Sequence, residues 1–268
     1  MRRGLESGAY PDLPQRHGVF GALLLVLQFY GRYREIGEVL QAPWSPVREQ
    51  CDERFDRLYA AALAATLSSV LPLKRRPRFH NLTLYLSSTR GVPGDVVECG
   101  CFMGLSAYLI CQALKEESAS FNGTGFRVFD SFEGLSEPTP QDVIPDGYPN
   151  AAGLRGMTQK GAFAATLDRV RKNLEEFPGV SFHPGWIPAT FRDLPEVRYR
   201  FVHVDVDLYQ PTCDALAYFY DRLSPGGMIV SDDYTWPGAR LALEEYAGLH
   251  NLKLEVPGTG QAALRKAD

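Results

Sequence analysis

From residue 91 onward, short apolar runs alternate with longer segments in which apolar residues recur every three or four positions. Short runs bounded by turn residues predict buried strands, and the longer segments predict amphipathic helices. We expect strands at 95–100, 126–130, 180–185, 201–207 and 228–233, and helices at 106–117, 163–177 and 211–223. Strands that alternate with helices predict parallel βαβ units, and therefore an α/β fold with helices on both faces of the sheet.

The first 90 residues have a helical rhythm throughout, which predicts a separate region, 1–90, ahead of an α/β domain at 91–268. One apolar stripe with helical spacing comprises Phe55, Leu58, Tyr59, Ala62, Thr66, Leu67 and Val70. A second helix is expected at 79–87. Residues 1–16 read as a loose tail. The basic run LKRRPR at 73–78 is typical of a solvated helix end rather than a binding patch.

Composition limits the class of protein. The chain has 268 residues, 45% of them hydrophobic, and a net charge of −4, which favours a globular protein and argues against nucleic-acid binding. The apolar run at 18–30 is too short for a transmembrane segment and favours a core helix over a peripheral membrane contact. The N-terminus is unlike a signal peptide, and the five cysteines form no CxxC pair, so reduced thiols in a cytoplasmic protein are expected.

The segment 136–161 is long, irregular and rich in proline and glycine. Loops of this length are uncommon in compact domains and often serve as lids. We therefore favour a lid over a passive insertion.

A glycine-containing stretch, ECGCFMGLSA, joins the first predicted strand to its helix. Gly100 allows a tight turn, Gly104 allows close approach of a ligand or helix, and the N–H groups at the helix start favour an anionic group. The dinucleotide fingerprint G-x-G-x-x-G is absent, because Phe102 stands at its second glycine. What remains, Glu98 followed by G-x-x-x-G, is the usual pattern of S-adenosylmethionine sites.

Asp130 ends the next predicted strand. A carboxylate at this place can bind both hydroxyls of a ribose. Asp130 could also cap a helix, with Glu133 completing a capping box, and the two roles are compatible.

Carboxylates follow the last two predicted strands. Neighbouring parallel strands lie about 4.8 Å apart, so their ends would bring Asp205, Asp232 and Asp233 together. Three carboxylates without a thiolate suit Mg²⁺. Asp207 lies on the same face as Asp205 and could act as a general base. The alternative is that these aspartates only cap loops and helices. His203, inside its strand, is expected to be a hydrogen-bonded core residue.

Three stretches, VPGDVVECG, VFDSFEGL and HVDVDLYQPTCDALAYFYDRLSPGGMIVSDDY, resemble the macrocin O-methyltransferase family over roughly residues 79–247. Its members use S-adenosylmethionine and Mg²⁺ to methylate sugar hydroxyls during bacterial natural-product assembly. The resemblance implies a doubly wound, mostly parallel, seven-stranded Rossmann-like sheet of the class I methyltransferase type. It also implies extra N-terminal helices, often used in oligomer contacts.

Site residues follow from the same resemblance. Asp205, Asp232 and Asp233 would bind the metal, and Asp207, with Asp205, would be catalytic. The donor would be surrounded by Glu98, Gly100, Cys101, Phe102, Gly104, Ser106, Asp130, Ser131, Gly185 and Trp186. The chain departs from the family pattern at Val206, where the family usually has glycine, and at Phe102, Met103 and Leu105 of the glycine loop. The 136–161 segment does not align.

The expected function is therefore metal-dependent methyl transfer from S-adenosylmethionine to a sugar hydroxyl of a glycosylated natural product such as an antibiotic, by a homo-oligomer. One alternative is a catechol-type O-methyltransferase that acts on an aromatic diol. Another is a glycosyltransferase, because D-x-D also binds nucleotide-sugar phosphates through a metal. A non-catalytic partner that retains the fold would have lost these carboxylates.

Overall fold

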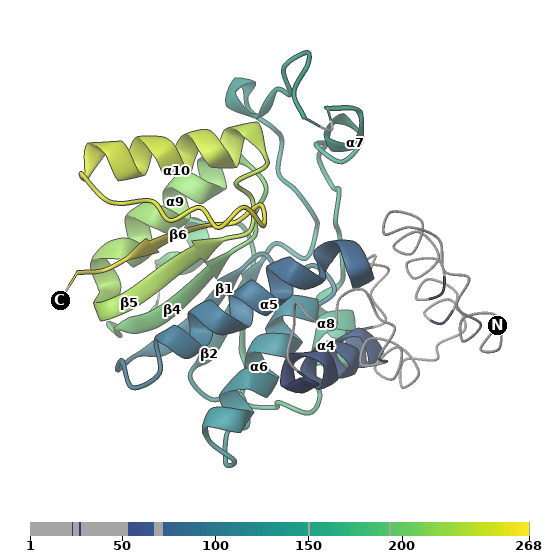
Figure 1. Ribbon diagram of the computed structural model, residues 1–268, viewed down its shortest axis with the longest axis vertical. Helices are drawn as coiled ribbons and strands as arrows, with labels where there is room; N and C mark the ends of the chain where they lie inside the picture. Colours follow the sequence, from purple (N-terminus) through teal and green to yellow (C-terminus); the bar gives the residue numbers. More distant parts are fainter. Residues whose placement is uncertain are drawn as a thin grey trace, which may run out of the picture.

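The computed structural model describes residues 53–66, 72–149, 151–192 and 194–267, together with Leu23 and Leu27. In this part of the chain one six-stranded sheet has the order β3-β2-β1-β4-β5-β6 (Figure 1). The strands are β1 (Asp95–Cys99), β2 (Phe126–Asp130), β3 (Ser181–Pro184), β4 (Tyr199–Val204), β5 (Leu223–Ser231) and β6 (Ala262–Arg265). β5 and β6 pair antiparallel, and the other neighbouring strands pair parallel. The predicted, mostly parallel α/β sheet is thus confirmed.

The expected number of seven strands is wrong, because the described residues form six. Beside β6 the chain adds only an isolated bridge, in which Glu255 and Ala263 exchange two backbone hydrogen bonds of 2.9 and 2.8 Å. Pro257 follows two residues later, and proline has no N–H to continue a ladder. The next residue, Gly258, has a positive φ of 80°, which turns the backbone out of the extended region.

Helices cover both faces of the sheet (Figure 1). One side carries α4 (Glu53–Thr66), α5 (Pro72–Ser88), α6 (Leu105–Glu117) and α8 (Leu167–Asn173), and the other carries α9 (Tyr209–Phe219) and α10 (Pro237–Leu249). Neighbours along a strand point to opposite faces, so Val96 joins the core under α4–α6 while Val97 joins the core under α9 and α10. This burial on both faces explains why the central strands are mostly apolar.

Two helices, α4 and α5, lie in the N-terminal part of the chain that the structure describes. In α4 the predicted stripe is buried from Phe55 to Thr66, and α5 begins at Pro72, earlier than predicted. The expected tail at 1–16 lies outside the described residues, as does most of the expected helix at 18–30; Leu27, within it, is helical and buried. No helix in the described ranges is long and apolar enough to cross a membrane.

The helix expected at 163–177 is shorter than predicted. The Thr166 side chain accepts a hydrogen bond from the Arg169 N–H and so caps α8, which begins at Leu167. Phe163 precedes the helix, with a φ of 60°. Some of the apolar residues that suggested a helix thus lie in the loop before α8. Phe163 is one of them, and it lines a cavity described below.

Candidate active site

A cavity of about 340 Å³ lies beyond the carboxyl ends of the central strands. This is where ligands bind in open parallel α/β sheets. Eight of the residues expected from the sequence line it together: Gly100, Phe102, Asp130, Ser131, Gly185, Trp186, Asp205 and Asp207. Four separate segments of the chain therefore meet at one concave site.

The glycine loop forms the floor of this cavity. Gly100 has a φ of 82°, and a β-carbon there would overlap the backbone oxygen of Asp205, so only glycine fits between the ends of β1 and β4. The Asp130 carboxylate closes the loop from the other side. It accepts hydrogen bonds from the N–H groups of Cys101 at 2.7 Å and Phe102 at 3.3 Å. The loop is thus held by its neighbours in the conformation that faces the cavity.

Asp130 does not cap a helix. No helix begins after it, and its second oxygen accepts a hydrogen bond from the Phe132 N–H at 2.7 Å, which closes a local turn. The predicted capping box with Glu133 is therefore wrong. Asp130 still lines the cavity, so its expected contact with a ribose stays a prediction.

Four other residues expected around the donor are not among those that line the cavity: Glu98, Cys101, Gly104 and Ser106. Glu98 is fully buried, and burial raises the pKa of its carboxyl group. It accepts a hydrogen bond from His203 Nδ1 at 2.9 Å. This bond joins the side chains of β1 and β4.

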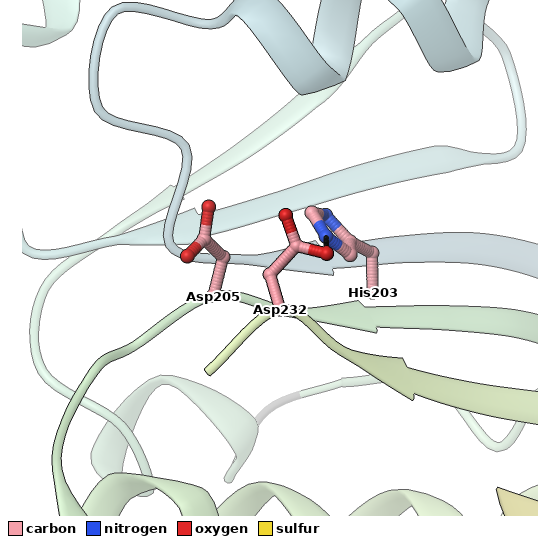
Figure 2. A group of neighbouring side chains, drawn as sticks. All are labelled: His203, Asp205 and Asp232. Carbon is pink, nitrogen blue, oxygen red and sulfur yellow. Dashed lines mark ion pairs between the residues drawn. The ribbon is translucent and has the colours of Figure 1, made fainter. Parts of the chain in front are cut away.

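The aspartates at the ends of β4 and β5 lie close together, but in two overlapping groups rather than in the single group of Asp205, Asp232 and Asp233 that was predicted; binding of one metal by these three stays a prediction. Figure 2 shows Asp232 between Asp205 and His203 at these strand ends. Carboxylate or imidazole atoms of His203, Asp205 and Asp232 lie within 4.8 Å of one another, and so do those of Asp205, Asp207 and Asp233. Asp205 belongs to both groups and joins them into one acidic cluster, defined here as Asp205, Asp207, Asp232 and Asp233.

Arg78 of α5 reaches into the acidic cluster, a contact that the sequence did not predict. Its Nε lies 2.5 Å from Asp232 Oδ2, and its Nη2 lies 3.4 Å from Asp205 Oδ2. The interpretation of residues 73–78 as a solvated helix end is therefore wrong for Arg78 and also for Arg76, which is fully buried. The basic run itself could have indicated this contact, because a helix that packs against carboxylates at the ends of strands needs positive charge.

Asp232 is the most strongly paired member of the acidic cluster. It also accepts a hydrogen bond from Gln261 Nε2 at 2.6 Å, and its Oδ1 lies 3.3 Å from His203 Nε2. Burial opposes ionisation of this carboxyl group, but Arg78 and His203 outweigh it and lower the pKa of Asp232 to about 2. Burial likewise opposes the charge on His203, yet the carboxylates of Asp232 and Glu98 raise its pKa to about 10. His203 is the buried, hydrogen-bonded core residue that was predicted.

Asp207 and Asp233 have the opposite character. Burial, and then the charge of Asp205, raise the pKa of Asp207 to about 7. Burial, and then Asp207 and Asp205, raise the pKa of Asp233. One Asp233 oxygen accepts a hydrogen bond from the Asp207 N–H at 2.8 Å, while the buried Oδ1 has no hydrogen-bond partner among the described residues.

The acidic cluster fits a divalent cation. Its four aspartates contact two basic side chains of the described chain, Arg78 and His203, which leaves an excess of negative charge. A buried carboxylate oxygen without a partner is costly, and Asp233 Oδ1 is such an oxygen beside two further carboxylates. Hard oxygen ligands of this kind suit Mg²⁺.

The segment 136–161 forms the rim of the cavity. It contains the short 3-10 helix η1 (Pro140–Asp142) and α7 (Ala151–Arg155). A small apolar cluster ties it to α10, with Ile144 and Leu154 packed on Trp236 and Ala239. The residues of this segment that line the cavity are Ser136, Glu137 and Thr139, directly after Gly134 and Leu135, which also line it. Its role as a lid stays a prediction.

Known proteins resemble this chain in sequence and in fold. Residues 66–261 match the family model described as Macrocin-O-methyltransferase (TylF). A curated relative from Streptomyces olivaceus, 8-demethyl-8-(2,3-dimethoxy-alpha-L-rhamnosyl)-tetracenomycin-C 4'-O-methyltransferase, is 35% identical over 179 residues, which are 63% of this chain and 65% of that protein. Mycinamicin III 3''-O-methyltransferase from Micromonospora griseorubida is 32% identical over 170 residues, 62% of this chain and 65% of that protein.

Among solved structures, the O-methyltransferase NovP superposes with a TM-score of 0.57 at 28% identity and covers 71% of this chain and 80% of that chain. The chain thus spans just under two thirds of the two curated relatives, at 65% of each, and a larger share of NovP. In all three comparisons the likeness includes more than half of this chain.

Proposed function

Because the chain belongs to the macrocin-O-methyltransferase (TylF) family, we propose that it transfers a methyl group from S-adenosylmethionine to a hydroxyl of a glycosylated small molecule. The observation that carries this proposal is the meeting of the glycine loop, Asp130 and two members of the acidic cluster, Asp205 and Asp207, at one cavity. The first two belong to the donor side. The acidic cluster belongs to the side on which an acceptor hydroxyl would lose its proton.

The acceptor class comes from the relatives. The Streptomyces olivaceus protein is named for an acceptor that carries a dimethoxy-rhamnosyl group. We extend this chemistry to the present chain, with a sugar hydroxyl as the methylated group. The aromatic and apolar cavity residues Phe163, Ile187 and Trp236 would contact the less polar part of such an acceptor.

On the donor side, S-adenosylmethionine supplies an electrophilic methyl group on a sulfonium. Gly100 and Phe102 would approach it through the backbone, and the carboxylate of Asp130 would receive the ribose hydroxyls. Trp186, which is 40% exposed at the cavity, offers a flat apolar face for a heterocycle.

Asp205, Asp232 and Asp233 would hold a Mg²⁺ ion, which when bound would lower the pKa of an acceptor hydroxyl. Asp207 lines the cavity beside them and would accept the hydroxyl proton. A positioned carboxylate is a suitable general base for a hydroxyl.

Calorimetric titration tests the donor. Titration with S-adenosylmethionine, with and without Mg²⁺, is expected to show saturable binding at one site. Titration with a UDP-sugar tests the glycosyltransferase alternative, which requires binding of the UDP-sugar and no binding of the sulfonium donor. Binding of the UDP-sugar alone would overturn the proposal.

Removal of the metal is expected to abolish turnover. Treatment with EDTA, or Asp205→Asn, is expected to lower methyl transfer to a glycosylated acceptor by about 10²–10⁴-fold, because a metal contributes several kcal/mol to stabilisation of developing charge. Transfer of labelled methyl groups measures the loss. Re-addition of Mg²⁺ should restore the activity of wild-type protein that was treated with EDTA.

Asp214→Asn is the matched control for this prediction. Asp214 also lines the cavity but lies on α9, outside the acidic cluster, where it accepts a hydrogen bond from Gln210. Its replacement should leave the response to EDTA unchanged. Full activity of wild-type protein in EDTA would contradict the metal role, and preference for a simple aromatic diol as acceptor would favour the catechol-type alternative.

A further inference from the structure

Asp142 is a buried carboxylate in the segment 136–161, and the donor and metal chemistry proposed above does not use it. Its side chain is 3% exposed. Oδ2 accepts hydrogen bonds from the N–H and the hydroxyl of Thr139, both at 2.7 Å, and Oδ1 accepts one from the N–H of Tyr209 at 2.7 Å. None of the lysines or arginines in the described ranges forms an ion pair with it. Three donors, and no cation, therefore hold this carboxylate.

The bond to Tyr209 places Asp142 at the start of α9. The first N–H groups of a helix lack partners inside the helix and form its positive end, which favours a carboxylate. In α9 the residue in the capping position, Leu208, has no side chain that can cap. Asp142 thus provides the cap from a distant part of the chain.

The start of α10 meets the same carboxylate. Gly238 lies in the first turn of α10, and a β-carbon there would overlap Asp142 Oδ1. Trp236, just before α10, packs on Ile144 of the segment 136–161. The carboxylate therefore lies between the first turns of two helices that both follow ends of the central strands.

Asp207 lies two residues before Tyr209 and has a φ of 60°, which is unfavourable for a residue with a side chain. Its own N–H donates to Asp233 at 2.8 Å. Two carboxylates thus fix the short segment 207–209. Asp233 holds it from the end of β5, and Asp142 holds it from the rim of the cavity.

We propose that Asp142 is a positioning residue that couples the acceptor side of the cavity to Asp207. Thr139 and Glu137 of the same segment line the cavity together with Asp207. Asp142 would thus hold the acceptor side of the cavity, formed by Glu137 and Thr139, in a fixed position relative to Asp207, which would accept the proton of the acceptor. This inference rests on the proposed function, because it assigns Asp207 as the base.

Kinetics of Asp142→Ala test the coupling. The variant loses the bond to Tyr209 and both bonds to Thr139. A displacement of about 1 Å at a reacting group can cost about 10²-fold in rate, so we expect kcat to fall by about that factor and the acceptor KM to rise by about tenfold. The donor Kd from calorimetry should stay within about twofold of wild type, because the glycine loop and Asp130 make no contact with Asp142.

Two further variants separate the bonds of this carboxylate. Asp142→Asn keeps an oxygen that can accept from Tyr209, so it should recover most of kcat. Thr139→Val removes one donor to Oδ2 and leaves the link to Tyr209, so its kcat should stay near wild type. An Asp142→Asn variant as slow as Asp142→Ala would overturn the assignment of the Tyr209 bond as the coupling contact.

Gly238→Ala tests the same contact from α10. Alanine normally favours a helix over glycine. Here its β-carbon would displace Asp142 Oδ1, so we expect the variant to show the kinetic defect of Asp142→Ala, despite its better helix propensity. Gly248→Ala, later in the same helix with no atom near an added β-carbon, is the control and should keep wild-type kinetics.

Amide hydrogen exchange tests the coupling without any acceptor. In Asp142→Ala and Gly238→Ala, peptides that contain Tyr209 and residues 136–149 should exchange faster than in wild type, while peptides of β1 and α6 should not. Unchanged exchange at Tyr209 would overturn the inference. Absence of methyl transfer by the wild-type protein would instead overturn the proposed function, whereas the exchange data would still show whether Asp142 holds the start of α9. Loss of thermal stability with unchanged kcat and KM would reduce Asp142 to a helix cap and overturn the positioning role.

Discussion

Replacement of Arg76 by methionine is expected to lower the free energy of unfolding by about 3–5 kcal/mol, because it leaves a buried charge without its ionic partner. Arg76 of α5 and Asp56 of α4 form an ion pair in which both side chains are almost completely buried. The Arg76 guanidinium also lies over the ring of Phe55, 5.2 Å from its centroid. Urea unfolding measures the loss, as a lower midpoint at constant slope.

Two further variants test whether the loss of stability comes from the unpaired, buried charge of Asp56. The double variant Arg76→Met with Asp56→Leu should recover most of the stability, since replacing a whole buried ion pair by apolar residues is often close to neutral. Arg54→Met removes an ion pair with Glu116 whose side chains are 43% and 36% exposed, and should change stability by less than about 1 kcal/mol. Equal losses for Arg76→Met and Arg54→Met would contradict the role of burial.

Gly100→Ala is expected to disrupt both the fold around the glycine loop and the binding of the methyl donor. The new β-carbon would overlap the backbone oxygen of Asp205, and φ at this position is 82°. Backbone strain and overpacking together should lower the free energy of unfolding by about 2–5 kcal/mol. Because the loop and Asp205 must move apart, we also expect kcat to fall by about 10²-fold or more. Urea unfolding, donor calorimetry and transfer of labelled methyl groups measure these effects.

Gly91→Ala is the matched control. Gly91 has a similar φ of 84°, but no atom lies within 4 Å of an added β-carbon. The free energy of unfolding of Gly91→Ala should fall by only about 1–2 kcal/mol, the cost of a left-handed backbone at alanine. The variant should bind the donor normally. If the two alanine variants lost the same stability and kept the same donor affinity, the overlap with Asp205 would not explain the need for glycine at position 100.

The sheet could be predicted because its strands are buried on both faces. Strands such as β1 and β4 are mostly apolar, although Glu98 and His203 are buried inside them, and aspartates follow the end of β4 closely. Parallel strands bring those ends to one edge. The nearness of these aspartates at the ends of β4 and β5 therefore followed from their places in the sequence, whereas their division into two groups, one of them with His203, did not.

Contacts between distant segments could not be predicted in the same way. Arg76 and Arg78 lie in one basic run, and only the packing of α5 decides that one faces Asp56 and the other faces Asp232. Asp142 lies in an irregular segment with no periodic pattern, and its partner Tyr209 is 67 residues away. Tertiary packing, rather than local preference, determines each of these pairs.

One missed element had a readable signal. The expected elements ended with the strand at 228–233, yet α10 follows, and it begins with Pro237 and Gly238. This pair resembles a turn, but proline is favoured at the first position of a helix, where its missing N–H costs nothing. Gly238 has no β-carbon, and this leaves room for the carboxylate of Asp142.

The rim segment has an apolar cluster of its own, separate from the two cores that hold the sheet. We therefore expect that residues 136–161 can be replaced by the corresponding segment of a relative with little disturbance of the strands beneath. Such a chimera needs more than the transplanted stretch, because Trp236, Gly238 and Ala239 supply the surface on which it sits. The segment and the start of α10 thus form one structural unit that is built from two stretches far apart in the sequence.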